Sequence, residues 1–387
     1  MSFKNVAIIL VLLTITLSAQ NEIKKTGGVA RLKSMGDNSF IIDPTNMLTN
    51  PAYGAYYDNF VWGDIGSTSN MGSDDGVGQF IGTSIRLNKS FTLGVMLSKS
   101  DHAYNRYNIM SIVTEDLNQF MPNDIPSPQN NTELFGTYKM DNTILGMGLS
   151  YSVSKAEQDY QSGIIRKEER AAHQFGLNFG LLTKLSEGID LEASAMFLAA
   201  GNLDDLDSLR LEGSQTIFSV DARAFIKIND HVNFIPTLGF YTISGDVEYT
   251  KKPAVGEYNN FDAPSTTNFK LGIGFDYSYS NLLFVGGPSI EFMGYNYEII
   301  EEGIKTTSDF SQTSIIWVLG LEWNATSWLT GRIGYKDATN YISYEQKHGN
   351  FSSKLNGIGS LTSNGFTLGI GLKFDKFSLD ATVNEDM

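Results

Sequence analysis

Histidine is the side chain best suited to proton transfer or metal binding near neutral pH, and this chain has four. They are His102, His173, His231 and His348. No two of them have the H-x-x-x-H spacing that places two imidazole rings on one face of a helix around a metal ion. His231 falls in an expected turn and His348 in an expected loop. We therefore expect solvated or interior histidines and no metal site.

Two acidic pairs suggest a second kind of chemistry. Asp74-Asp75 and Asp101-His102 flank one expected strand hairpin. Some barrel-shaped proteases hold a water between an Asp pair and an Asp-His pair at the barrel rim, where the histidine acts as general base. Aspartate is also a common loop residue in an acidic chain, and no Ser-His-Asp spacing stands out. We expect no catalytic residue and no enzymatic activity.

A cluster of oxygen-bearing side chains lies in the middle of the chain. Asn202, Asp204, Asp205 and Asp207 carry the kind of oxygen ligands that calcium prefers. The cluster lacks the glycine and the terminal glutamate of an EF-hand loop. A solvated acidic loop is the simpler interpretation.

Several Gly-x-Gly pairs could suggest a nucleotide site. They occur at Gly146-x-Gly148, Gly272-x-Gly274 and Gly369-x-Gly371. Each lies inside an alternating segment rather than before a helix, so the mechanism of a phosphate-binding loop is missing. Glycine in such a segment clears interior space or permits strand bending. We expect no cofactor.

The segments around these residues alternate between apolar and small or polar side chains. The clearest runs from Phe269 to Tyr279, where every odd position is apolar or aromatic and every even one is Lys, Gly, Asp or Ser. A period of two indicates a β-strand with one apolar face. About ten residues suffice for a tilted strand to cross a bilayer. The segment therefore has the length and pattern of one strand of a lipid-facing barrel wall.

The same pattern predicts fifteen strands. We place them at 56–66, 75–87, 90–100, 131–140, 143–155, 170–185, 189–199, 214–228, 231–249, 266–280, 282–300, 308–324, 327–345, 361–374 and 376–384. Short turns rich in Asn, Asp and Gly alternate with longer polar segments, which we read as outer loops at 101–130, 156–169, 200–213, 250–265, 301–307 and 346–360. Short inner turns and long outer loops are typical of outer-membrane barrels.

These strands predict an all-β fold, an up-and-down antiparallel transmembrane β-barrel of 14–16 strands. Bacterial single-chain barrels have even strand numbers, so a count of fifteen requires a correction. Either a C-terminal strand is missing after Met387, or the segment 56–66 is a false strand and fourteen remain. Trp317, Trp323 and Trp328 lie toward strand ends or beside a turn, as expected for an aromatic girdle at the membrane interface.

The N-terminus carries a different pattern. Residues 1–19 read as a signal peptide, with Lys4 before an apolar core and cleavage expected after Ala19. Residues 20–55 lack strand periodicity, and Pro44 after Asp43 suggests one short helical turn. We expect 20–55 to be an N-terminal plug or periplasmic lead-in and 56–387 to be the barrel.

Composition narrows the classes further. The net charge of −15 and the pI near 4.7 provide no basic footprint for nucleic acid. The mean hydropathy of −0.15 is too low for a helical membrane protein, whereas a barrel conceals its apolar residues at alternate positions. The chain has no cysteine, so disulfides are excluded. We predict a location in the outer membrane of a Gram-negative bacterium, with its lipid as a partner.

Short N-terminal motifs resemble a known family. The chain has Met35-Gly36 followed by Asn50-Pro51-Ala52 and a strand with Trp62-Gly-Asp, which is similar to FadL-like outer-membrane proteins. The closest resemblance is to the PorV/PorQ-like or uncharacterised Bacteroidetes-type branch. It implies a porin-like barrel of about fourteen strands with an N-terminal plug. It implies passive transport or binding of hydrophobic small molecules, or alternatively service to protein secretion or surface attachment through secretion-system components.

Candidate ligand contacts come from the longest loop and from inward cations. Apolar residues of 101–130 could form an amphipathic helix ending at Pro122 over the barrel mouth, or a simple lid. Inward Lys and Arg tune the selectivity of a lumen or form ion pairs across a filled interior. The candidates at the mouth and in the lumen are Ile109, Ile112, Leu117, Phe120, Lys270 and Arg332.

Overall fold

The structure is a computed structural model and describes residues 27–65, 79–100, 129–162, 164–206, 209–251, 260–301, 304–359 and 365–384. The expected signal peptide, the Asp74-Asp75 and Asp101-His102 pairs and the loop candidates Ile109, Ile112, Leu117 and Phe120 lie outside these residues.

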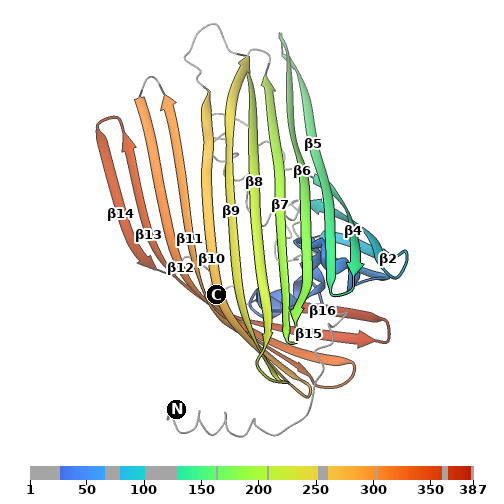
Figure 1. The fold of residues 1–387 in the computed structure, drawn as a ribbon. Coiled ribbons are helices and arrows are strands. Elements are labelled where there is room, and N and C mark those ends of the chain that lie inside the picture. The colour runs from blue at the N-terminus through green and yellow to red at the C-terminus, as the bar shows by residue number, and fades with distance from the viewer. Residues whose placement is uncertain are drawn as a thin grey trace.

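The described chain forms one antiparallel sheet of sixteen strands, in which neighbours along the chain are neighbours in space with one exception (Figure 1). The strands are β1 Phe60–Ile65, β2 Gln79–Arg86, β3 Phe91–Ser100, β4 Gln129–Met140, β5 Thr143–Ser162, β6 Ile164–Ser186, β7 Ile189–Leu206, β8 Leu209–Lys227, β9 Val232–Lys251, β10 Phe261–Tyr279, β11 Leu282–Glu301, β12 Ile304–Asn324, β13 Leu329–His348, β14 Phe351–Gly359, β15 Gly365–Phe374 and β16 Phe377–Asn384. The predicted all-β, up-and-down antiparallel class is confirmed.

The exception is β13, which pairs with two different strands along the same edge. Its second half, from Asn340 to His348, pairs with β14, and its first half, from Leu329 to Lys336, pairs with β15. Among the described strands β1 and β16 each have one partner and do not pair with each other, so the sheet curls without closing. The prediction of a loop over 346–360 was wrong, because most of these residues form the end of β13 and the whole of β14. The segment around 60–65 is a strand, so the alternative of a false strand there is also wrong.

Most of the central strands are longer than predicted. The pairing of β5 with β6 continues from Thr143 to Ser162, across most of the expected loop 156–169, and β7 and β8 likewise fill most of 200–213. The backbone ladder needs no apolar side chains, so a hairpin continues beyond the part that has a regular apolar alternation. Alternation of hydrophobicity marks only the part of a strand with one apolar face, and the sequence-based boundaries stopped there.

The two faces of the sheet differ in polarity. On β12, Ile315, Trp317 and Leu319 point outward and are 37–50% exposed, while Ser314 and Glu322 point inward and are buried. Other strands repeat this division, with Phe, Leu, Ile and Met outside and Ser, Thr, Asn and Gln inside. An apolar exterior around a polar interior is the arrangement of a transmembrane barrel wall and the reverse of a soluble sandwich.

Tight turns join the strands at one end of the sheet. Asp141, Ser280 and Asp375 adopt positive φ angles of 33°, 53° and 48°, and Gly188 adopts 85°. These residues lie in four of the short turns predicted from sequence. Hairpin turns of two residues require this left-handed backbone, which Gly, Asn and Asp tolerate best.

The N-terminal segment, residues 27–58, lies inside the curve of the sheet (Figure 1). It contains helix α2 at Val29–Ser34 and two 3-10 turns, η1 at Pro44–Leu48 and η2 at Pro51–Ala55. A capping box of Asp43 and Asn46 starts η1, with Pro44 at the first helical position, as the sequence suggests. Within the described ranges no helix is long and apolar enough to cross a membrane.

Candidate functional site: the interior wall and the N-terminal segment

The N-terminal segment contacts the inner wall in two regions. Helix α2 lies against β13, β15 and β16, and η2 lies against β3, β4, β5 and β6. These contacts join the first strands of the sheet to the last ones, across the seam that the strands themselves leave open. The segment therefore bridges the open sheet from within.

A buried ion network holds the first region. Arg31 Nε lies 2.7 Å from Glu322 Oε2, and Arg31 Nη1 lies 3.1 Å from Asp43 Oδ2. Glu322 Oε2 also accepts from Arg332 Nε at 2.8 Å, and Arg332 Nη1 lies 2.5 Å from Asp380 Oδ1. The network has three carboxylates and two guanidinium groups, and its side chains are no more than 10% exposed. It links α2 to β12, β13 and β16 in one chain of charge-assisted bonds.

Burial acts on the two N-terminal members in opposite ways. It works against the charge of Arg31, but Glu322 and Asp43 outweigh it and raise the pKa of this guanidinium above its usual value. Burial raises the pKa of Asp43, although Arg31 and the amide and hydroxyl of Thr45 oppose the shift. Arg31 therefore stays charged, because its attraction to Glu322 and Asp43 offsets the unfavourable free energy of burying the charge.

A second ion pair holds the middle of the segment. Arg223 Nε on β8 lies 2.5 Å from Glu192 Oε1 on β7. Arg223 Nη1 donates to the carbonyl oxygens of Ser39 and Ile41, at 2.6 and 2.8 Å. The Tyr53 hydroxyl donates to Glu192. Burial and the nearby Glu192 raise the pKa of Tyr53 well above its usual value, so the phenol stays neutral and remains a donor.

Inward-facing glycines receive the segment on both sides. Gly146 and Gly180 are cross-strand partners on β5 and β6, and a Cβ at either would overlap the Asn50-Pro51-Ala52 turn. The Asn50 amide donates to the wall carbonyls of Leu181 and Ala193, at 3.4 and 3.2 Å. Each missing side chain lets two backbones approach closely.

A matching pair of glycines lies on the other side of the seam. Gly320 and Gly334 are partners on β12 and β13, and Met35 packs against both. A Cβ at Gly320 would lie 2.9 Å from Met35 Cε. The prediction that strand glycines clear interior space holds for Gly146, for Gly274 beneath Phe40 and for Gly369 beneath Ser34.

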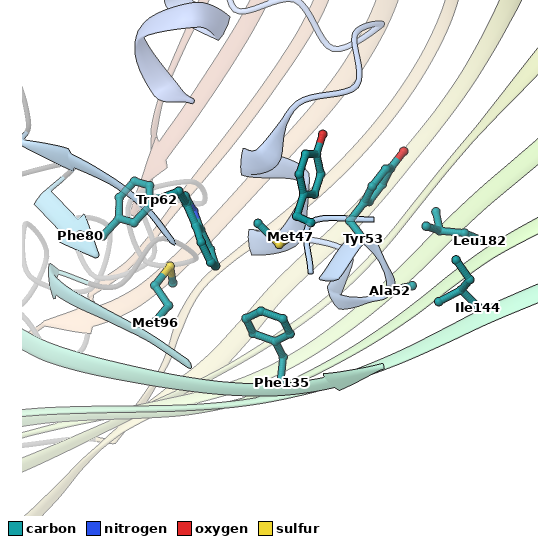
Figure 2. Close-up of a cluster of buried hydrophobic side chains, with 10 residues drawn as sticks. Met47, Ala52, Tyr53, Trp62, Phe80, Met96, Phe135, Ile144 and Leu182 are labelled. Carbon is teal, nitrogen blue, oxygen red and sulfur yellow. The ribbon is translucent and has the colours of Figure 1, made fainter. Parts of the chain in front are cut away.

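An apolar cluster fixes the rest of the segment (Figure 2). Figure 2 shows Met47 and Tyr53 of the segment together with Phe135 and Trp62 of the wall, which belong to the same cluster. The rings of Trp62 and Phe135 meet edge to face with centroids 6.4 Å apart. The cluster consists of Met47, Ala52, Tyr53, Tyr57, Trp62, Phe80, Met96, Phe135, Ile144 and Leu182. The segment is therefore held by packing as well as by charge.

A separate apolar patch lies farther along the inner face, on β6 to β10. It consists of residues that are at most 5% exposed and contact one another: Ala172, Leu198, Ala200, Leu211, Ile217, Ile243, Val247 and Ala263. Met196, Tyr241 and Tyr249 pack against it. The strand register places all of them on the inner face, where most of the wall is polar. We call this set the inner apolar patch.

The two predicted cations have different environments. Arg332 lies in the buried ion network, where it pairs with Glu322 and Asp380, and its role as a ligand contact stays a prediction. Lys270 is half-buried on the inner face of β10, opposite Gly239 on β9 and Glu291 on β11. The register leads from Lys270 through Glu291 and Ser314 to Asn340, eight residues along β13 from Arg332. The two do not form one site.

Most of the predicted acidic loop belongs to strands β7 and β8, and Asp207 lies outside the described residues. Asn202 and Asp204 are buried on the inner face of β7, whereas Asp205 points to the other face and contacts Arg210. Alternation thus splits the cluster, and the prediction of a solvated loop was wrong. Within the described residues no three His, Cys, Asp or Glu side chains gather around a metal position. His231 Nδ1 lies 3.0 Å from the Ser278 carbonyl oxygen, in the turn where it was expected.

Sequence reasoning missed most of the contacts that hold the segment. Glu192, Arg223 and Glu322 each stand at an inward position of an alternating strand, and a charge at such a position is a signal for a lumen-facing ion. Arg31 carries no such signal, because its partner Glu322 lies 291 positions away in sequence. Asp43 lies outside the strands, so no alternation marks it either.

No model of a known protein family matches this chain, and no curated protein matches its sequence. Among solved structures, it is similar to the Pseudomonas putida toluene transporter TodX, with 10% identity, a TM-score of 0.37 and coverage of 92% of this chain and 94% of that one. It is also similar to the FrpB iron transporter from Neisseria meningitidis (7% identity, TM-score 0.39, coverage 78% and 65%) and to BauA, the ferric preacinetobactin receptor from Acinetobacter baumannii (8%, 0.39, 76% and 63%). The chain spans less than two thirds of the latter two. Similarities of this size say nothing about what the chain binds.

Proposed function

We propose that this protein is an outer-membrane β-barrel that binds hydrophobic small molecules in its interior and passes them across the membrane. The location is supported by the outward belt of apolar side chains on strands long enough to cross a bilayer. The N-terminal segment, anchored to both sides of the seam, serves in this proposal as the plug.

The observation that carries the function is the inner apolar patch. The lumen of a channel for ions or polar solutes is lined by polar groups, whereas Leu198, Ile217 and Ile243 lie side by side on this inner wall. Leu198 and Ile217 are 0% exposed and Ile243 is 1% exposed, so an apolar ligand reaches them only by displacing the residues that cover them. It then gains about 0.8 kcal/mol for each methylene group removed from water. Binding through the patch therefore strengthens with alkyl chain length.

The test is saturable binding of an alkyl probe to the protein in lipid nanodiscs. A dodecyl diazirine is photolysed with and without excess dodecane, and the labelled peptides are mapped by mass spectrometry. Labelling that dodecane suppresses is expected on β7, β8 and β9, while the outward belt labels without saturation. Ile217→Asn is expected to weaken the saturable binding about tenfold, and the matched control Ser314→Asn, on the inner face of β12, is not.

Absence of saturable labelling, or equal effects of the two substitutions, contradicts the proposal. The alternative of a barrel that serves protein secretion or surface attachment stays a prediction. Co-purification of secretion-system components with the full chain would support it.

A further inference from the structure

The inner apolar patch adjoins a group of buried polar side chains that have atoms without a hydrogen-bond partner. They are Gln174 on β6, Asn202 and Asp204 on β7 and Gln215 on β8, each no more than 5% exposed. Within the part of the chain that the structure describes, both amide atoms of each glutamine, Asn202 Nδ2 and both Asp204 carboxylate oxygens are unsatisfied. Buried polar atoms are nearly always paired, and leaving one unpaired is destabilising.

The strand register places these side chains together. One row across the wall runs Ser152, Gln174, Ala200, Gln215 and Gly245. The row above it runs Ala172, Asn202, Gly213 and Val247, and Asp204 lies in the next row, opposite Arg170 and Leu211. With strands about 4.8 Å apart, Gln174 and Gln215 are roughly 10 Å apart. The four polar groups therefore border a single small area of the inner wall.

The row below is apolar. It contains Gly176, Leu198, Ile217 and Ile243 in register. Asn202 packs on Gly213 and Gln215 packs on Gly245. A side chain at either glycine would overlap the neighbouring amide side chain. The donors and acceptors thus lie in rows that also hold Ala172, Ala200, Leu211 and Val247 of the patch, and the row of Leu198, Ile217 and Ile243 lies about 7 Å away along the strands.

We infer that this part of the wall binds a neutral amphiphile, with its head group on the four polar side chains and its alkyl chain along the inner apolar patch. The head group carries both donors and acceptors, as in a monoacylglycerol or a fatty amide, because the unsatisfied atoms are of both kinds. Arg170 Nε lies 3.9 Å from Asp204 Oδ2 and balances its charge, so the site favours no net charge on the ligand. The inference rests on the proposed function and names its ligand class.

The experiment compares 1-lauroylglycerol with dodecane as competitors of the dodecyl diazirine on the full chain in nanodiscs. We expect 1-lauroylglycerol to compete at least tenfold more strongly than dodecane, since its hydroxyls satisfy buried amides that dodecane leaves unpaired. The double substitution Gln174→Leu with Gln215→Leu is expected to remove this advantage and to leave dodecane competition unchanged.

Two controls separate recognition from folding. Asn340→Leu removes a buried, partly unsatisfied amide from β13, outside the proposed site, and is expected to preserve the advantage. The conservative pair Gln174→Asn with Gln215→Asn is expected to restore part of it, which a folding defect would not.

The results also separate this inference from the proposed function. If dodecane competes and 1-lauroylglycerol competes no better, the amides are merely hydrated and the inference falls while the proposed function stands. If the leucine variant keeps the full advantage, the inference falls in the same way. If neither compound competes in the wild-type protein, the proposed function falls and the inference falls with it.

Discussion

At the scale of single residues, the interior is organised around charges that the sequence separates widely. Arg31 meets Glu322 across the molecule, and Arg223 reaches the backbone of the N-terminal segment from the wall. Removing one member of such a pair is strongly destabilising, because the remaining charge is buried without a partner of opposite sign.

Glu322→Gln tests the first network. The substitution leaves Arg31 and Arg332 buried without their shared carboxylate, so we expect the free energy of unfolding to fall by about 3 kcal/mol. Urea unfolding followed by tryptophan fluorescence measures it.

The control is Glu298→Gln, which breaks the exposed pair with Lys305 and is expected to cost less than about 1 kcal/mol. Equal losses for the two glutamine variants would contradict the account of the network.

The phenol of Tyr53 predicts a pH dependence. Its pKa is raised well above the unfolded value of about 10, so the folded protein binds a proton that the unfolded chain releases. This contribution to stability is complete below pH 10 and is lost as the pH rises from there toward the folded pKa. We expect the urea midpoint to fall above pH 10, and to fall less steeply in Tyr53→Phe. Identical slopes in the two proteins would show that Tyr53 titrates normally.

At the scale of elements, paired glycines on neighbouring strands decide where the N-terminal segment sits. Gly146 and Gly180 accept the turn at Asn50, and Gly320 and Gly334 accept Met35. These positions gain nothing in strand propensity from glycine, which weakens a strand interior. Their value lies in the close approach that they permit.

Gly180→Val tests this arrangement. Its side chain would overlap Asn50, so we expect the N-terminal segment to leave the wall and become open to protease. Trypsin cleavage after Lys33, scored by mass spectrometry, is expected to quicken at least tenfold in the folded protein. The control is Gly331→Val, where a Cβ would meet no atom within 4 Å. If both variants resist trypsin like the wild type, the glycines do not position the segment.

Sequence periodicity predicted the elements well in the part of each strand with one apolar face. The segment from Phe269 to Tyr279 is the second half of β10, as expected, but β14 and the outer extensions of β5 to β8 went unseen. β14 is exposed on both faces, and acidic residues and glycines interrupt the alternation in 200–213, so no regular pattern records their pairing. Of the residues in the buried ion network, Arg332 could be singled out from sequence because an inward charge interrupts a regular pattern. The patch of Leu198, Ile217 and Ile243 could not, because it needs the strand register.

At the scale of the whole molecule, the account depends on which face of the sheet meets lipid. The outer face carries Leu, Ile and Trp at 37–51% exposure on β12 and large apolar side chains in a similar range on many neighbouring strands, and the inner face carries buried polar groups. In water this distribution would expose an apolar surface far larger than soluble monomers tolerate. In a bilayer the same surface is solvated by lipid chains.

The four tryptophans permit a direct measurement of this claim. Trp317, Trp323 and Trp328 are 50–51% exposed on the outer surface, and Trp62 is 6% exposed inside. Single-tryptophan variants, with the other three replaced by Phe, are reconstituted into vesicles of lipids brominated along the acyl chain. The account predicts strong bromine quenching of Trp317, and little quenching of Trp62. Quenching of Trp62 with Trp317 unaffected would contradict it.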